Sequence, residues 1–155
     1  MALEIERKFL VTSDAWRDGP AGVRISQGYL TRDPARTVRV RIAGGKAFIT
    51  IKGKTSGVSR PEFEYPIPVD EARALLDLCL PPLIDKVRHE RQHGGHLWEI
   101  DEFLGANAGL VVAEIELADA HESFERPEWL GREVSDDLRY YNASLAERPW
   151  SEWGA

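Results

Sequence analysis

The residues best suited to chemistry are charged side chains that stand two positions apart. The stretch "EIERKFL" places Glu4, Glu6 and Lys8 at alternating positions, with other residues between them. A β-strand would put these three charged groups on one face. Neighbouring carboxylates repel each other and a hard divalent cation relieves that repulsion, whereas a lysine can bind phosphate oxygens. The simpler alternative is a charged face that points to water.

The same spacing recurs in later segments, and each of these carries one type of charge. Bases stand at Arg39 and Arg41 in "TVRVRI", Lys52 in "FITIKG", and Lys86 and Arg88 in "IDKVRHE". Acids stand at Glu62 and Glu64 in "EFEY", Glu99 and Asp101 in "WEID", and Glu114 and Glu116 in "AEIEL". Arginine has a planar fork suited to phosphate oxygens, and paired carboxylates suit a divalent cation. The pattern therefore favours a site for a metal and a polyanion over a solvated face.

Alternation of apolar and polar residues predicts the strands that would position these groups. The predicted strands cover residues 2–11, 23–32, 36–43, 46–53, 60–68, 83–93, 96–103 and 110–118. Helical spacing predicts a helix in "VDEARALLDLCL", with Asp70 as its N-cap and Pro81 and Pro82 ending it. Shorter helices are expected at 13–18 and 119–126, and Ser135 is expected to cap a last helix in "DDLRYYNASLAE".

Two Gly-Gly pairs predict hairpins and thereby fix the register of the strands around them. With Gly44 and Gly45 as a two-residue loop, Arg41 lies opposite Phe48, Arg39 opposite Thr50 and Thr37 opposite Lys52. With Gly94 and Gly95 as a loop, Glu90 lies opposite Glu99 and Arg88 opposite Asp101. Two facing carboxylates are unfavourable unless a cation or a proton lies between them.

An antiparallel sheet of eight strands tends to close into a barrel whose interior holds side chains or one small ligand. We therefore expect a mainly β (α+β) fold, an eight-stranded antiparallel closed β-barrel with flanking helices. With the charged face inward, water, metal ions and a polyanion must compensate the buried charges. Helices or a partner subunit must then cover the outward apolar face. Periodicity alone does not decide which face points inward.

Composition restricts the class of protein. A chain of 155 residues with 43% hydrophobic residues suits a single domain spanning 1–155. The net charge of -6 argues against a nucleic-acid or membrane partner bound through bulk charge. Cys79 is the sole cysteine, as expected for a buried thiol in a reducing compartment. With no apolar signal region or membrane-length apolar run, we expect a soluble, cytoplasmic protein.

The charged segments also carry a family resemblance. "EIERKFL", "QGYL", "VRVR", "TIKG", "EFEYPI", "DKVRHER", "WEIDEF", "AEIEL" and "RYYNASLA" follow one another along nearly the whole chain. Their order and spacing resemble the CYTH superfamily, the triphosphate tunnel metalloenzymes, and look most like its short bacterial inorganic tripolyphosphatases. The superfamily also contains class IV adenylate cyclases and thiamine triphosphatases, so the shared fold does not fix the substrate.

This resemblance implies that the charged face points into a tunnel that binds a triphosphate and Mg²⁺ or Mn²⁺. By matching position it implies phosphate-binding and catalytic roles for Lys8, Arg39, Arg41, Lys52, Lys86 and Arg88. It implies that Glu4, Glu6, Glu114 and Glu116 hold the metals, with catalytic roles for Glu4 and Glu6, and that Glu62, Glu64 and Asp101 bind metal through water or orient the bases. Phosphoryl transfer then needs in-line geometry and charge neutralisation, with no covalent nucleophile.

Several alternatives stay open. A class IV-type adenylate cyclase, or another nucleoside or thiamine triphosphatase, would need an additional pocket beside the tunnel, and a polyphosphate-binding module would leave the metal site unused. A homodimer could cover the outward apolar face. Glu99 has an equally good reading as a rim or salt-bridge residue, and Tyr29, Arg139 and Asn142 as packing or capping residues. A zinc site at the clustered histidines and a Ser-His-Asp triad lack supporting motifs.

Overall fold

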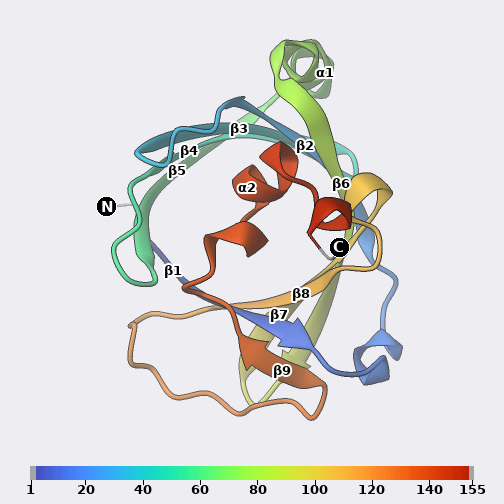
Figure 1. Ribbon diagram of the computed structural model, residues 1–155, viewed down its shortest axis with the longest axis vertical. Coiled ribbons are helices and arrows are strands. Elements are labelled where there is room, and N and C mark those ends of the chain that lie inside the picture. The colour runs from blue at the N-terminus through green and yellow to red at the C-terminus, as the bar shows by residue number, and fades with distance from the viewer. Residues whose placement is uncertain (1–2, 154–155) are drawn as a thin grey trace.

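The structure, a computed structural model, describes residues 3–153. Eight antiparallel strands close into a barrel and a ninth extends the sheet (Figure 1). The strands are β1 (Leu3–Val11), β2 (Val23–Thr31), β3 (Arg36–Ala43), β4 (Lys46–Gly53), β5 (Ser59–Ile67), β6 (Leu80–His93), β7 (His96–Phe103), β8 (Val111–Glu116) and β9 (Leu130–Glu133). Neighbouring strands follow the order β5-β4-β3-β2-β6-β7-β8-β1-β9, and an additional β5–β1 pairing closes the ring. The predicted eight-stranded antiparallel barrel is therefore confirmed.

Both Gly-Gly hairpins have the predicted register. In the first, Arg39 lies opposite Thr50 and Arg41 opposite Phe48. In the second, Glu90 lies opposite Glu99 and Arg88 opposite Asp101. Gly44 has a φ of 60° and Gly94 a φ of 58°, a left-handed conformation that costs glycine little. All eight predicted strands are present, and position 2 of the first one lies outside the described residues.

Strand β1 uses its two halves differently at the seam of the barrel. Its first residues pair with β5, with Leu3 opposite Pro61 and Glu4 opposite Arg60. Its last residues pair with β9 at the same edge, with Phe9 opposite Glu133. Strand β9 was not predicted, because a strand of four residues is too short to show a clear alternation.

Helix α1 (Val69–Leu78) has the predicted position but not the predicted cap. Pro68 occupies the N-cap position without a capping side chain, and Asp70 lies in the first turn, where a carboxylate favours the helix dipole. The helix ends before Pro81 and Pro82, as expected. These prolines belong to β6, which begins at Leu80 rather than at residue 83, because Leu80 pairs with Tyr29 of β2.

The helix predicted at 119–126 is wrong. This segment forms a turn and a loop, and the sequence expected as a helix at 13–18 gives one 3₁₀ turn, Ala15–Arg17. The carboxylate of Glu122 accepts a hydrogen bond from the backbone N–H of Ala118, and that of Asp119 accepts one from His121. Such side-chain bonds to nearby backbone groups compete with helix formation.

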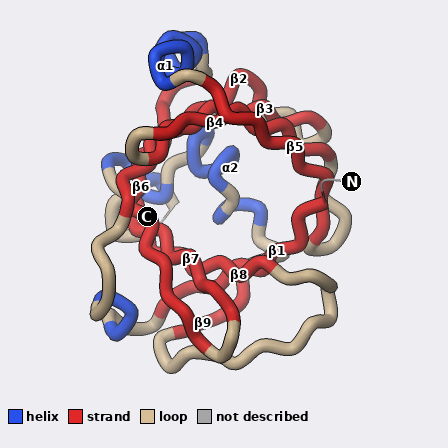
Figure 2. Tube along the Cα trace, turned by 180° about the vertical axis from the view of Figure 1, so that it is seen from behind, coloured by secondary structure: helices blue, strands red, loops and turns tan. Residues whose placement is uncertain are grey.

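The C-terminal segment also differs from the single helix that was predicted. It forms a 3₁₀ turn, Leu138–Tyr140, followed by the short helix α2 (Asn142–Glu147). Asp137 caps the turn by accepting from the Arg139 N–H, whereas the Ser135 hydroxyl accepts from the Lys8 N–H of β1. Figures 1 and 2 show α2 within the outline of the barrel, where its buried side chains pack against β6 and β7.

The outward apolar face of the barrel is covered on most sides. Trp16 and Trp129 pack over Trp98 of β7, and α1 packs over Val40 and neighbouring residues of β3 and β4. On the outer side of β4 and β5 the apolar surface stays partly bare, with Ile51, Phe63 and Tyr65 between 39% and 53% exposed. Residues 3–153 contain no helix that is long and apolar enough to span a membrane.

Candidate active site

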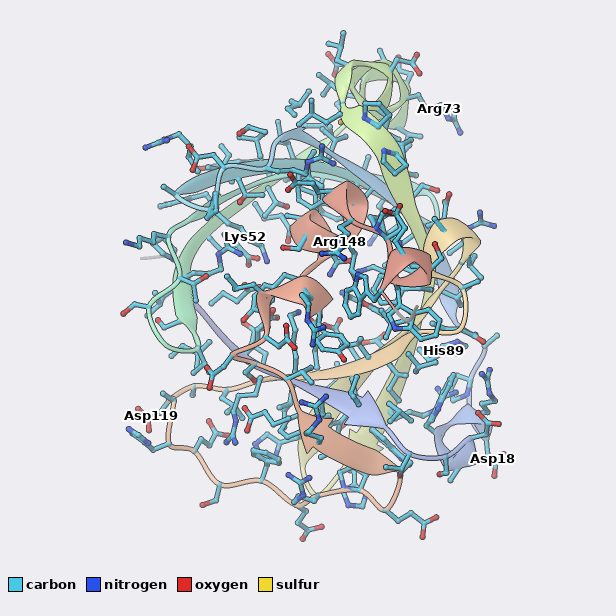
Figure 3. The ribbon with its side chains drawn as sticks, viewed as in Figure 1. Asp18, Lys52, Arg73, His89, Asp119 and Arg148 are labelled. Atoms are coloured by element: carbon cyan, nitrogen blue, oxygen red, sulfur yellow. The ribbon has the colours of Figure 1, made fainter. Side chains whose placement is uncertain are left out.

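The predicted charged face surrounds a cavity of about 240 Å³ inside the barrel. Lys52, labelled in Figure 3, extends from the barrel wall toward this interior. The cavity is lined by the bases Lys8, Arg39, Arg41, Lys52, Arg60 and Arg88 and by the acids Glu4, Glu6, Glu62, Glu64, Glu99, Glu114 and Glu116. The inward direction of the charged side chains, which periodicity left open, is therefore settled for these residues.

Acids and bases occupy different parts of the ring of strands. We call β8, β1 and β5 the acidic wall, because they bring six of the lining carboxylates and only two bases, Lys8 and Arg60. We call β4, β3, β2, β6 and β7 the basic wall. It brings the other four bases, and its lining carboxylate is Glu99 on β7.

In the acidic wall the antiparallel register sets charged groups side by side. Glu6 lies opposite Glu116, and Lys8 lies opposite Glu114. The Lys8 ammonium contacts Glu114 at 2.5 Å and Glu6 at 3.2 Å. Burial alone would raise the pKa of Glu114, but Lys8 beside it lowers that pKa to about 2. Lys8 can therefore neutralise one carboxylate of this wall fully, and the others remain in excess.

Three other carboxylates of the acidic wall, Glu4, Glu6 and Glu116, resist ionisation. Burial raises the pKa of Glu4 and of Glu6, and it raises the pKa of Glu116 with help from Glu4 and Glu6. Lys52 opposes the rise at Glu4, which it contacts at 3.0 Å. A divalent cation would hold these oxygens in their ionised form, so the donor set fits a hard metal such as Mg²⁺. In residues 3–153 no three acidic or histidine side chains are already gathered as metal ligands.

The basic wall offers guanidinium groups with free hydrogen-bonding capacity. Arg39 is 7% exposed and contacts Glu64 at 3.6 Å and the hydroxyl of Thr50 at 3.2 Å. Its buried Nε has no hydrogen-bond partner among the described residues. Among the described residues, Arg41 donates only to the amide oxygen of Gln27, at 2.9 Å. Both arginines therefore keep donors available for an anion.

Lys86 and Asp101 share the inward strand faces of Arg88 and Glu99, but they are not among the residues that line the cavity. They are 0% and 1% exposed and contact each other at 2.8 Å. Arg88 donates to both oxygens of Asp101, at 2.7 and 2.8 Å. Burial alone would raise the pKa of Asp101, but Arg88 and Lys86 hold it well below its usual range. Both Asp101 oxygens thus contact these two bases, which is the geometry that its predicted role of orienting the bases requires.

The four positions whose roles the sequence left open do not all lie in the same place in the structure. Glu99, Tyr29 and Asn142 line the cavity. Arg139 lies outside it, with its guanidinium 2.6 Å from the Asp137 carboxylate on the surface. Arg60 was missed as a lining residue, although it shares the alternation of Glu62 and Glu64 and stood in the predicted strand.

The histidines are remote from this chemistry. His89 packs against Trp16 at 4.9 Å between ring centroids, and His89 and His96 each contact one glutamate, Glu102 and Glu122. One carboxylate beside each ring does not make a zinc site. The structure therefore gives His89 and His96 packing and hydrogen-bonding roles on the outside of the barrel.

Comparisons with known proteins agree with this geometry. The CYTH domain family matches residues 2–149. An inorganic triphosphatase of Acetivibrio thermocellus is 47% identical over 154 residues, covering 99% of both chains, and one of Nitrosomonas europaea is 37% identical, covering 92% of this chain and 96% of that one.

Solved structures share the barrel. The crystal structure of the inorganic triphosphatase NE1496 superposes with a TM-score of 0.66 at 34% identity, covering 92% of this chain and 96% of that one. The PH1012 protein of Pyrococcus horikoshii has a TM-score of 0.55 at 16% identity, covering 76% and 80%, and shows the fold alone. From the match over most of its length and from these relatives, the chain belongs to the CYTH domain family.

Proposed function

We propose that this chain hydrolyses inorganic tripolyphosphate to pyrophosphate and phosphate, with a divalent metal ion, inside the cavity of its barrel. The observation that carries the proposal is the pairing of a carboxylate-rich wall with a guanidinium-rich wall around one enclosed cavity. A polyanion and its metal ions need such opposite surfaces at close range. The two relatives named inorganic triphosphatases support the same substrate class.

The basic groups bind and neutralise the phosphates in this proposal. Arg39, Arg41, Lys52 and Arg88 hold phosphate oxygens from the basic wall, and Lys8 does so from the acidic wall. Phosphoryl transfer depends on positioning and on neutralising the charge of the transferred group and the leaving oxygen. Arg60, at the seam beside Glu4, joins this set. Lys86 acts indirectly, through its contact with Asp101, which in turn contacts Arg88.

The acidic groups bind the metal. Membership of the family implies a divalent metal, and we propose Mg²⁺ or Mn²⁺ because the donors are all oxygens. Glu4, Glu6, Glu114 and Glu116 are the first set of ligands, and Glu62 and Glu64 reach the ion directly or through water. When bound, the ion supplies positive charge at the phosphates and acidifies the attacking water. The chain's own contribution is to keep these carboxylates together at the cost of mutual repulsion.

The lining also bears on the choice of triphosphate. Beside its charged groups and the small polar residues, it offers Tyr29, Tyr141 and Ala143. Tyr141 already has a partner, because the Lys8 ammonium lies 4.8 Å from its ring centroid. A nucleobase or a thiamine ring needs a larger apolar or aromatic surface. The composition of the cavity therefore favours inorganic tripolyphosphate over ATP or thiamine triphosphate.

The direct test is phosphate release by the purified protein from tripolyphosphate, ATP, thiamine triphosphate and long-chain polyphosphate. Each substrate is supplied with Mg²⁺, with Mn²⁺ or with a chelator. We expect metal-dependent release that is fastest from tripolyphosphate and lost in chelator. A cyclic nucleotide product from ATP would favour a cyclase instead, and binding without turnover under every metal would favour a binding module.

We also propose that residues 1–155 act as a single cytoplasmic domain with no nucleic-acid or membrane partner, and that two copies form a homodimer. The bare apolar surface of Ile51, Phe63 and Tyr65 supports the dimer, because contiguous exposed apolar patches often mark interfaces. Sedimentation velocity of the wild type and of Phe63→Asp tests it. We expect a dimer that the substitution dissociates, and a monomeric wild type would contradict the proposal.

A further inference from the structure

Arg41 differs from most other bases of the cavity in the kind of partner that holds it. Lys8, Arg39, Lys52 and Arg88 each contact a carboxylate. Arg41 instead donates from Nε to the amide oxygen of Gln27, at 2.9 Å, and has no acidic contact among the described residues. An amide fixes the direction of a guanidinium without neutralising its charge. Arg41 is thereby oriented and still fully available to an anion.

Gln27 is in turn held from the C-terminal segment. It is 0% exposed and does not line the cavity. Its Nε2 donates to the side-chain oxygen of Asn142, at 3.2 Å, and its Nε2 also lies 3.4 Å from the Tyr29 hydroxyl. Because one end of the amide binds Arg41 and the other binds Asn142, the position of Asn142 determines how Gln27 presents its oxygen.

The side-chain oxygen of Asn142 accepts a second hydrogen bond, from a residue of β6. Its Oδ1 also accepts from the ammonium of Lys86, at 2.9 Å. Lys86 contacts Asp101 at 2.8 Å, and Asp101 accepts both bonds from Arg88. One oxygen atom on the first residue of α2 thus joins two supports, one leading to Arg41 and the other to Arg88.

We infer that Gln27 and Asn142 are positioning residues that hold Arg41 in its phosphate-binding orientation, and that they couple the docking of α2 to the binding of the triphosphate. The inference rests on the proposed function, in which Arg41 and Arg88 bind phosphate. Its physical basis is that buried polar groups with satisfied partners are rigid, and that a pre-oriented guanidinium loses less freedom on binding. Substrate affinity should therefore depend on the side-chain amides of Gln27 and Asn142, although Gln27 does not line the cavity and cannot touch the substrate.

The test uses Gln27→Met and Asn142→Ala, singly and together. Each variant removes one link to Arg41, so we expect the KM for tripolyphosphate to rise about tenfold with kcat within about threefold of wild type. The double variant should lose no more than the worse single variant, because both residues act through one chain of bonds. A merely structural role would reduce the amount of active enzyme, and with it the apparent kcat, without moving KM.

Two further variants serve as controls. Asn142→Ser keeps a neutral oxygen that can accept a hydrogen bond and adds no charge to the cavity, so its KM should lie nearer to wild type than that of Asn142→Ala. Asn107 is also a buried asparagine, 4% exposed, whose side chain accepts from the Trp150 N–H at 2.8 Å and ties down the C-terminus far from Arg41. Asn107→Ala should lower the Tm and leave KM unchanged.

Calorimetric titration of tripolyphosphate in chelator, where no hydrolysis is expected, separates this inference from the proposed activity. Weaker binding by Gln27→Met and Asn142→Ala, with wild-type binding by Asn107→Ala, supports the inference even if the wild type does not hydrolyse tripolyphosphate. Equal KM and equal affinity in wild type and both variants would overturn it. Absence of any binding by the wild type, both in chelator and with Mg²⁺, would overturn both the inference and the proposed function.

Discussion

The acidic and basic walls line one cavity, but they compensate their buried charge in opposite ways. In the acidic wall the pKa values of Glu4, Glu6 and Glu116 are raised, chiefly by burial, so the protein itself does not supply enough cations. In the basic wall, two bases lower the pKa of Asp101. Folding thus supplies two cations to Asp101, but it leaves the acidic side short of positive charge and leaves Arg41, whose pKa burial lowers to about 9, short of negative charge. A metal ion would complete the acidic wall, and a polyanion would bind the open donors of the basic wall.

The largest effect is expected from removing the internal support of the basic wall. Asp101→Asn removes the carboxylate that contacts the buried Lys86 ammonium and leaves Arg88 with Glu99 alone, because the replacement amide has no charge. We expect a loss of about 3–5 kcal/mol in the free energy of unfolding. Chemical denaturation measures it, with Asp137→Asn at an exposed ion pair as the control, where the loss should stay below about 1 kcal/mol. Equal losses in the two variants would remove this distinction between the walls.

The next effect concerns the basic wall's open donors. Arg39→Ala removes a guanidinium whose buried Nε has no partner among the described residues. A charged hydrogen bond contributes about 1.5–3 kcal/mol, so the KM for tripolyphosphate should rise about tenfold to a hundredfold. Steady-state kinetics of Arg36→Ala, which removes an exposed arginine paired with Asp33 on the surface, provide the control. An unchanged KM in Arg39→Ala would show that the basic wall does not bind the substrate.

A smaller effect is expected at the seam. Arg60 lines the cavity but belongs to the acidic wall, and within residues 3–153 it donates only to the Gly53 carbonyl and the Thr37 hydroxyl. Because it is partly exposed, its attraction for the substrate is screened, and Arg60→Ala should raise KM about threefold to tenfold. Kinetics at low and high salt should show a steeper salt dependence in the wild type than in the variant. Arg73→Ala on α1 is the matched surface control, and an Arg60→Ala variant that behaves like it would exclude Arg60 from the site.

The smallest effect is a dependence of stability on pH that metal should suppress. Because the pKa values of Glu4, Glu6 and Glu116 are raised in the folded protein, these groups stabilise the metal-free fold least when they are ionised. Their contribution is most favourable below their unfolded pKa and is lost as the pH rises through the folded values. Thermal melts at about pH 4.5, the ordinary pKa of these carboxyl groups, and at about pH 8 should therefore show a larger gain in Tm from Mg²⁺ at the higher pH. A larger gain at the lower pH would contradict the assignment of metal to the acidic wall.

Sequence periodicity predicted the walls better than it predicted the depth of individual residues. The alternation of Glu4, Glu6 and Lys8 and the two Gly-Gly loops fixed strand faces and registers, because both depend on local geometry. Lys86 has the same alternation as Arg88, yet it is fully buried and does not line the cavity. Its depth depends on the curvature of the closed barrel and on Asn142 from a distant segment, which no local pattern contains.

The errors outside the barrel arise where side-chain hydrogen bonds replace the expected helix or cap. Residues 119–126 have helical spacing, but bonds from Asp119 and Glu122 to nearby backbone N–H groups hold a turn. Ser135 is a good capping residue, and the structure uses its hydroxyl for the Lys8 N–H instead. The first outcome depends on local side-chain bonds and the second on a tertiary partner. Arg60 is a different case, because its place in the alternation of β5 was a sufficient signal for its position in the cavity.

The central claim, that the acidic wall binds the metal while the basic wall binds the triphosphate, is tested most directly by a Mg²⁺ titration of tripolyphosphate hydrolysis in wild type and Glu4→Gln. The substitution keeps an oxygen that can accept from Lys52 and removes only the charge. We expect kcat to fall about a hundredfold, while tripolyphosphate affinity in chelator changes less than about threefold. Glu71→Gln on α1 should behave as wild type. Metal-dependent hydrolysis at the wild-type rate by Glu4→Gln would contradict the claim.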